Sequence, residues 1–147
     1  MTIPSTFQTQ MNVHEGLKAG LGANGQIPLM QWYPRIVAKT AAYTVLASES
    51  GSIFTTTAAG GSVTFTLPAI STGPWIYRFL CGAAQTTVVA AETLDTAVGF
   101  NDLDLDSVSF AQASEKIGGE ILAICDGTTL FLLPRLASAA QTVTFTD

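Results

Sequence analysis

Three aspartates, Asp102, Asp104 and Asp106, stand at alternate positions in the stretch FNDLDLDSV. On a β-strand, alternate residues project to the same face, so these carboxylates would form one row with the intervening leucines on the other face. Such a row could hold Ca²⁺, but the EF-hand pattern fails, because its sixth and twelfth positions are Ser107 and Ala113 instead of Gly and Glu. We favour a solvated edge strand whose acids discourage wrong pairing, and we keep a calcium site at the three aspartates as the alternative.

Residues for catalysis are scarce. The only histidine is His14, and its surroundings, NVHEG, contain no nucleophile or partner motif for a catalytic triad. Glu92 and Glu120 could serve as a glycosidase pair, but the sequence does not place them together. Neither pair of adjacent glycines, 60–61 or 118–119, is followed by the Lys-Ser or Lys-Thr of a phosphate-binding loop. We therefore expect a protein that is not an enzyme and has no cofactor.

The two cysteines, Cys81 and Cys125, do not have a metal-ligand spacing, and each lies in an apolar run. Since we do not expect a secreted chain, we expect two buried reduced thiols. A disulfide between neighbouring strands is the alternative.

Composition and charge exclude several classes of protein. Hydrophobic residues make up 48% of the 147-residue chain, charged residues make up 12%, and the net charge is −5. The six Lys and Arg do not cluster, so the sequence lacks the basic face of a nucleic-acid-binding protein. No apolar run approaches the ~20 residues of a membrane span. The N-terminus, MTIPSTFQTQ, does not resemble a secretory signal, and we expect synthesis and assembly in a cytoplasm.

The elements that must position these residues are short strands in residues 41–136. Alternation is clearest in SVTFTLP, residues 62–68, and similar apolar β-type runs follow up to TLFLLPRL. Gly60-Gly61 and Asp126-Gly127 are hairpin signals. The pattern predicts an all-β fold: an antiparallel β-sandwich, jelly-roll-like, or a small barrel.

Residues 1–40 lack strand alternation and contain many Gly, Pro, Asn and Gln residues. We expect an extended N-terminal arm that lies along a neighbouring molecule; an arm that folds back on its own domain is the alternative. The C-terminal segment 137–147 contains TVTFT, which predicts a strand at a sheet edge in its own subunit or in a neighbour. The apolar anchors assigned to partner binding by the arm are Phe7, Met11, Val13, Leu17, Ile27, Leu29, Trp32 and Tyr33.

Residues 43–81 resemble a module of tailed-bacteriophage virion proteins. Its marks are a Tyr-Thr-Val strand, a Ser-Gly turn, Ile-Phe-Thr, a Gly turn with Val-Thr-Phe-Thr-Leu-Pro, and an aromatic Tyr-x-Phe strand. Residues 124–133, ICDGTTLFLL, resemble the closing hairpin of the same module, although Leu130 and Phe131 stand where a Trp is common. The stretch FQTQMNV, residues 7–13, is similar to the N-terminal arm of phage capsid cement proteins.

This resemblance implies a virion protein on the capsid surface, a decoration (cement) protein that binds the lattice of the major capsid protein and stabilises the head. It also implies a homotrimer, because such proteins commonly sit at threefold positions. Self-association itself is expected from two strands, WIYRFL and ILAIC, that are apolar on both faces and need cover on both sides. A tail, tail-fibre or baseplate component is the first alternative. A carbohydrate-binding adhesin is the second, with Trp32, Tyr33, Trp75 and Tyr77 as rings for sugar stacking.

Overall fold

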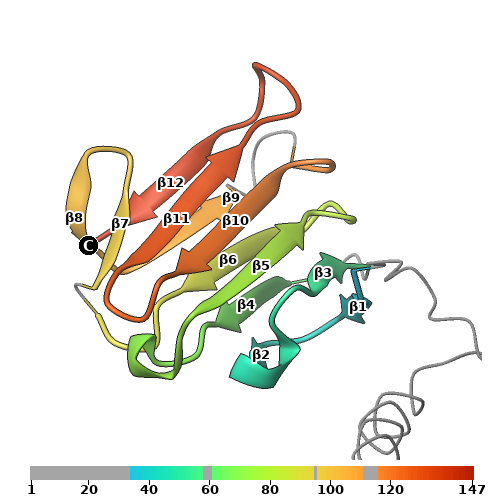
Figure 1. Cartoon of the computed structure of the whole chain (residues 1–147). Helices are drawn as coiled ribbons and strands as arrows, with labels where there is room; N and C mark the ends of the chain where they lie inside the picture. Colours follow the sequence, from blue (N-terminus) through green and yellow to red (C-terminus); the bar gives the residue numbers. More distant parts are fainter. Residues whose placement is uncertain (1–33, 58–60, 95, 111–115) are drawn as a thin grey trace, which may run out of the picture. The chain divides into compact units, whose positions relative to one another are not determined.

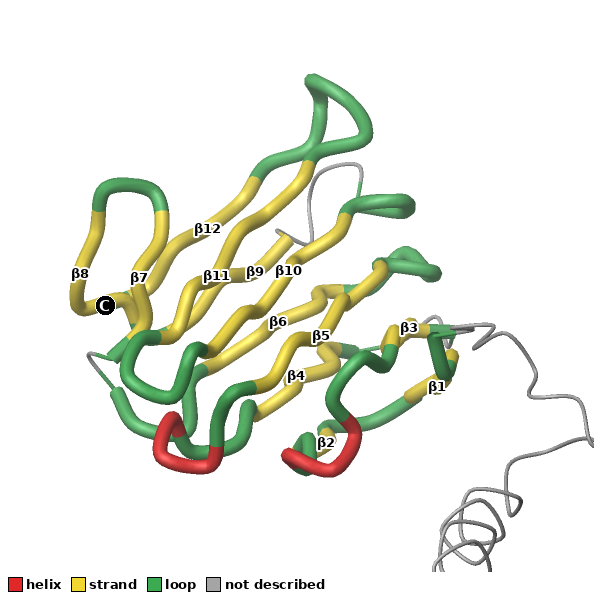
Figure 2. Tube along the Cα trace, viewed as in Figure 1, coloured by secondary structure: helices red, strands yellow, loops and turns green. Residues whose placement is uncertain are grey.

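Val63, Phe65 and Leu67 alternate with threonines, so the strand that they form has one buried face. The same alternation holds in most strands of the molecule. The computed structural model describes residues 34–57, 61–94, 96–110 and 116–147. These residues belong to one compact unit, Pro34–Asp147. The unit is an all-β sandwich of two sheets, as the sequence predicts (Figure 1, Figure 2).

Sheet A has seven strands in the order β1-β3-β5-β10-β11-β7-β8. Their bounds are β1 Ile36–Lys39, β3 Ile53–Thr56, β5 Trp75–Leu80, β7 Ala97–Gly99, β8 Asp102–Leu105, β10 Glu120–Cys125 and β11 Leu130–Arg135.

Sheet B has five strands in the order β12-β9-β6-β4-β2. Their bounds are β2 Tyr43–Thr44, β4 Ser62–Thr66, β6 Thr86–Ala90, β9 Ser107–Phe110 and β12 Val143–Thr146, and two short 3-10 helices, η2 Ala47–Glu49 and η3 Ile70–Thr72, lie in the connections. No helix in the described ranges is long and apolar enough to cross a membrane.

The expected all-β sandwich is confirmed, and its two sheets are mixed, with parallel as well as antiparallel strand pairs. From β1 to β6 the chain changes sheet after every strand, so strands two apart in sequence become parallel neighbours: β1 with β3, β3 with β5, β2 with β4, and β4 with β6. The Gly60-Gly61 signal therefore does not mark a hairpin, because β3 and β4 belong to different sheets. The Asp126-Gly127 hairpin is confirmed, with β10 and β11 antiparallel and Cys125 opposite Leu130.

The β-domain also begins earlier in the chain than the sequence analysis expects. Residues 36–39 form β1, which pairs in parallel with β3 at one edge of sheet A. The β-domain therefore begins at Pro34 and not at residue 41, because four residues of the expected arm contribute a strand. At the other end of the chain, β12 pairs antiparallel with β9 and forms an edge of sheet B in the same subunit.

Aromatic rings from both sheets fill the interior. Phe54 and Phe79 come from sheet A and stack with centroids 5.4 Å apart, and Phe65 from sheet B lies 4.9 Å from Phe79. All three are fully buried. Aromatic pairs of this kind add about 0.5–1.5 kcal/mol beyond the area that they bury, so this cluster holds the two sheets together.

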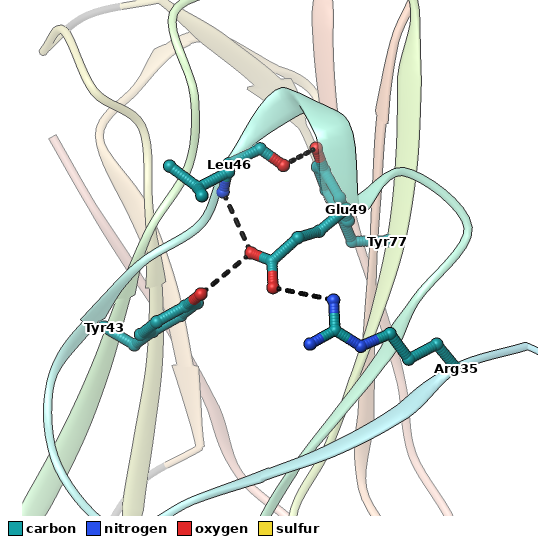
Figure 3. A network of polar contacts seen from close by, with 5 residues as sticks. All are labelled: Arg35, Tyr43, Leu46, Glu49 and Tyr77. Atoms are coloured by element: carbon teal, nitrogen blue, oxygen red, sulfur yellow. Dashed lines mark hydrogen bonds and ion pairs between the residues drawn. The ribbon is translucent and has the colours of Figure 1, made fainter.

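A buried carboxylate fastens the first strands to this core (Figure 3). Glu49 is only 7% exposed, and its carboxylate accepts hydrogen bonds from the Tyr43 hydroxyl at 3.0 Å, the Leu46 amide at 3.1 Å and the Arg35 guanidinium at 3.3 Å. The Tyr77 hydroxyl donates to the Leu46 carbonyl at 3.0 Å, and burial raises the pKa of Tyr77 to about 12. The network ties the entry of the β-domain to sheet A.

Candidate functional site

The two outer faces of the sandwich differ in chemistry. Outward positions of sheet B carry mostly hydroxyls, and the register places them in rows such as Ser62 beside Thr86 and Thr144 beside Ser109. Hydroxyls hydrogen-bond with water, so this face suits solvent. The outward positions in the sheet B strands are Thr44, Ser62, Thr64, Thr66, Thr86, Val88, Ala90, Ser107, Ser109, Thr144 and Thr146.

The outer face of sheet A is apolar instead. Ile124 of β10 lies between Ile76 of β5 and Phe131 of β11, and in the next row Leu122 lies beside Leu133. In the strand register the face extends to Val98 on β7, to Ile53 on β3, which is itself buried at 8% exposure, and to Ile36 on β1. We use the term outer face of sheet A for these residues, Ile36, Ile53, Ile76, Val98, Leu122, Ile124, Phe131 and Leu133, together with Arg78, Glu120 and Arg135.

Several of these side chains are open to solvent: Ile36 is 70% exposed, Ile76 41% and Leu133 40%. Contiguous exposed apolar surface of this kind marks interaction sites in soluble proteins. The sequence prediction that β5 and β10 are apolar on both faces is correct for β10. In β5, Arg78 interrupts the outward row.

The cation Arg78 is neutralised on the face itself. Its guanidinium makes a two-point ion pair with Glu120, with Nη2 to Oε2 at 3.0 Å and a second hydrogen bond from Nε to Oε1. This hydrogen bonding lowers the pKa of Glu120 below its ordinary value. Because the two charges are paired, the middle of the face can be buried against another molecule without leaving an unpaired charge.

Glycosidase chemistry finds no support in this arrangement. A general acid needs a raised pKa, whereas the pKa of Glu120 is lowered by Arg78. Glu92 lies in the turn after β6, where its carboxylate accepts a hydrogen bond from Thr93 at 2.7 Å. Two of the four rings considered for sugar stacking, Trp75 and Tyr77, are buried in the core at 3% and 0% exposure.

The row of aspartates lies on an edge strand, as the sequence predicts. Asp102 and Asp104 belong to β8, an edge strand of sheet A, and Asp106 follows it. Among the residues that the structure describes, no three acidic, histidine or cysteine side chains are arranged to hold a metal ion. Asp102 Oδ1 accepts a hydrogen bond from the Asp104 amide at 3.3 Å, and interactions with Asp104 and Asp147 lower the pKa of Asp102.

Both cysteines are buried free thiols, which agrees with the favoured interpretation. Burial raises the pKa of the Cys81 thiol, and such a thiol is a poor nucleophile. His14 and the arm residues Phe7, Met11, Val13, Leu17, Ile27, Leu29, Trp32 and Tyr33 lie outside the described residues.

Sequence reasoning missed the Arg78–Glu120 pair and the Glu49 network. Arg78 is the one charged residue in WIYRFL, which is a signal that it needs a partner. Its partner lies 42 positions away in sequence and follows only from strand register. Comparison with protein-family models, with curated proteins and with solved structures found no match to this chain.

Proposed function

We propose that this chain is a structural protein of a tailed-bacteriophage particle, a capsid decoration protein that self-associates, as a trimer, and stabilises the lattice of the major capsid protein. The observation that carries the proposal is the contrast between the two outer faces, hydroxyl-rich on sheet B and apolar on sheet A. A monomer in water gains nothing from the apolar face. A subunit in an assembly gains roughly 25 cal/mol for each Å² of apolar surface that it buries there, before ordering costs.

The mechanism is burial of surface rather than chemistry. Repetition over a lattice multiplies weak contacts into strong retention. In this proposal sheet A supplies the contacts between copies, and the N-terminal arm, with its anchors from Phe7 to Tyr33, supplies the contacts with the major capsid protein. The resemblance of residues 43–81 and 7–13 to phage virion proteins supports the choice of particle.

Self-association is tested on the full chain by light scattering at micromolar concentration. We expect three times the mass of one chain. Leu133→Thr, which removes apolar surface from the outer face of sheet A but keeps a good strand former, should shift the mass toward one chain. Val88→Thr, which places threonine at an apolar position on the outer face of sheet B, is the control and should leave the mass unchanged. A monomeric wild-type chain would contradict the proposal.

Location is tested with antibody against the full chain, applied to intact tailed-phage particles from the lysate in which the chain is made. Label over the head, seen by electron microscopy, supports decoration. Label on the tail, tail fibre or baseplate would replace the head assignment with the alternative. Particles without label would rule out a virion role.

A further inference from the structure

An aromatic side chain stands at the tip of the β7–β8 hairpin. Gly99 is paired with Asp102, so Phe100 and Asn101 form a two-residue turn with φ angles of 50° and 69°. Such turns favour Asn, Asp or Gly at both positions, because a positive φ is unfavourable for bulky residues. Phe100 occupies this position with 79% of its surface exposed, so the hairpin holds an apolar ring outward where the turn alone would select a polar residue.

The tip is held in place. The Phe100 ring stacks on Phe145 of β12, with centroids 4.9 Å apart and an interplanar angle of 28°. At the base of the hairpin, a Cβ on Gly99 would lie 2.6 Å from the Leu132 carbonyl oxygen, so β7 approaches β11 as closely as a glycine permits. Leu103, 77% exposed, extends the apolar surface along β8. We call Phe100, Leu103 and Phe145 the Phe100 tip.

Carboxylates surround this tip. Asp102 and Asp104 flank Leu103 in β8, and Asp147 follows β12, the strand whose Phe145 stacks on Phe100. Asp102, Asp104 and Asp106 together raise the pKa of Asp147, so the four acids lie within electrostatic reach of one another. The tip is therefore apolar and acidic, and two such tips would repel each other.

The outer face of sheet A has the complementary character. Away from its β8 edge, which carries Asp102 and Asp104, this face is apolar, and its ionisable groups there are Arg78, Arg135 and Glu120. Glu120 is paired with Arg78 in its own subunit, and Arg135, opposite Glu120 in β11, is exposed. The part of the face formed by β5, β10 and β11 thus carries one more cation than anion, in a chain whose net charge is −5.

We infer that the Phe100 tip of one copy docks on the outer face of sheet A of the next copy, with its aspartates beside Arg135. This inference rests on the proposed self-association and assigns its two surfaces. Because they are different surfaces, the contact is heterologous, and repeating it by a closing rotation produces a ring. Three copies in the ring would give the trimer, with every tip and every face occupied.

The test uses the full-length chain alone, with the dissociation constant measured by sedimentation equilibrium. Phe100→Asn should raise the constant by about thirtyfold, as expected for a central aromatic anchor. Asn is favoured in this turn, so the hairpin should still form. Leu46→Asn is the matched control: Leu46 is 55% exposed and precedes η2, a position where Asn is well accepted, and association should be unchanged.

A charge exchange tests the electrostatic part. Asp104→Arg and Arg135→Asp should each weaken association at low salt, because each places like charges together. The double variant should recover most of the loss. The docking is wrong if Phe100→Asn has the same dissociation constant as the wild type. It is also wrong if the double variant associates as weakly as the two single losses added together. In both cases the wild-type chain still self-associates, so the proposed function stands. A monomeric wild type would instead refute the proposed function itself.

Discussion

Arg78 and Glu120 are diagonal neighbours on adjacent strands of sheet A, and each of two guanidinium nitrogens donates to a different carboxylate oxygen. The pair lies in the middle of an apolar sheet face, with Leu122 directly opposite Arg78 in the strand register. Its geometry keeps both charges satisfied if that face becomes buried against another molecule. It also makes the stability of the domain depend on pH.

The first prediction concerns this dependence. The pKa of Glu120 is lowered in the folded state, chiefly by the hydrogen bond from Arg78. Its contribution is therefore present above the unfolded pKa of about 4.3 and is lost as the pH falls through the folded pKa. Glu120→Gln should reduce the free energy of unfolding at pH 7 by about 1 kcal/mol, a modest value because Arg78 is half exposed. Denaturant titrations should show the difference shrinking as the pH falls below the unfolded pKa and through the lowered folded pKa; a constant difference would contradict the assignment.

Asp147 should show the opposite sign. Its pKa is raised by its hydrogen bond with Asp102 and by the neighbouring negative charges, so its charge destabilises the folded state at neutral pH. Asp147→Ala should raise the denaturation midpoint at pH 7, and the gain should fade as the pH falls and the wild-type carboxyl takes up a proton. Asp126→Ala is the counterpart, because hydrogen bonds from Thr128 and Thr129 lower the pKa of Asp126; it should lower the midpoint.

Glu49 should be important for folding although it is charged. Replacement by Ala leaves the Tyr43 hydroxyl and the Leu46 amide without their acceptor, and such a loss costs about 1–3 kcal/mol. Arg35→Ala should cost less than about 1 kcal/mol, because the arginine side chain is 65% exposed. Thermal unfolding of the two variants gives the comparison, and equal losses would mean that the ion pair carries the network.

Gly119 should not tolerate a methyl group. A Cβ there would lie 2.6 Å from the buried Phe110 ring, and overpacking of this kind costs about 1–3 kcal/mol. Gly61, with φ of +82° and open space around its Cβ position, serves as the comparison, since Gly61→Ala introduces backbone strain alone, about 1–2 kcal/mol. Adding Phe110→Leu should recover stability in the Gly119→Ala background but not in the Gly61→Ala background.

Deleting residues 1–33 should leave a folded β-domain, because the compact unit starts at Pro34. Circular dichroism should retain the β spectrum and a cooperative melt, while binding to phage particles should fall strongly. Deleting residues 1–39 removes β1 and Arg35 and should also lower the melting temperature. An unfolded 34–147 fragment would show that the N-terminal segment belongs to the core.

The sequence predicted the strands better than their partners. Alternation in SVTFTLP and the apolar run ILAIC place side chains on faces, because side-chain direction depends only on the local period of two. Alternation does not state which strand lies next to which. The parallel pairing of β4 with β6 depends on the chain crossing to the other sheet and back, and the glycines at 60–61 are compatible with either route.

For the candidate site, too, the sequence predicted some features and the tertiary structure alone showed the others. Composition showed a low charged fraction, 12%, and WIYRFL and ILAIC predicted apolar residues on both faces of two strands. Only the tertiary structure decided that these residues share one face with Phe131 and Leu133, and that sheet B faces water with hydroxyls. It alone brought Arg78 to Glu120 and Phe100 to Phe145, 42 and 45 positions apart, because contacts between distant residues are fixed by strand register and sheet packing, which no local pattern encodes.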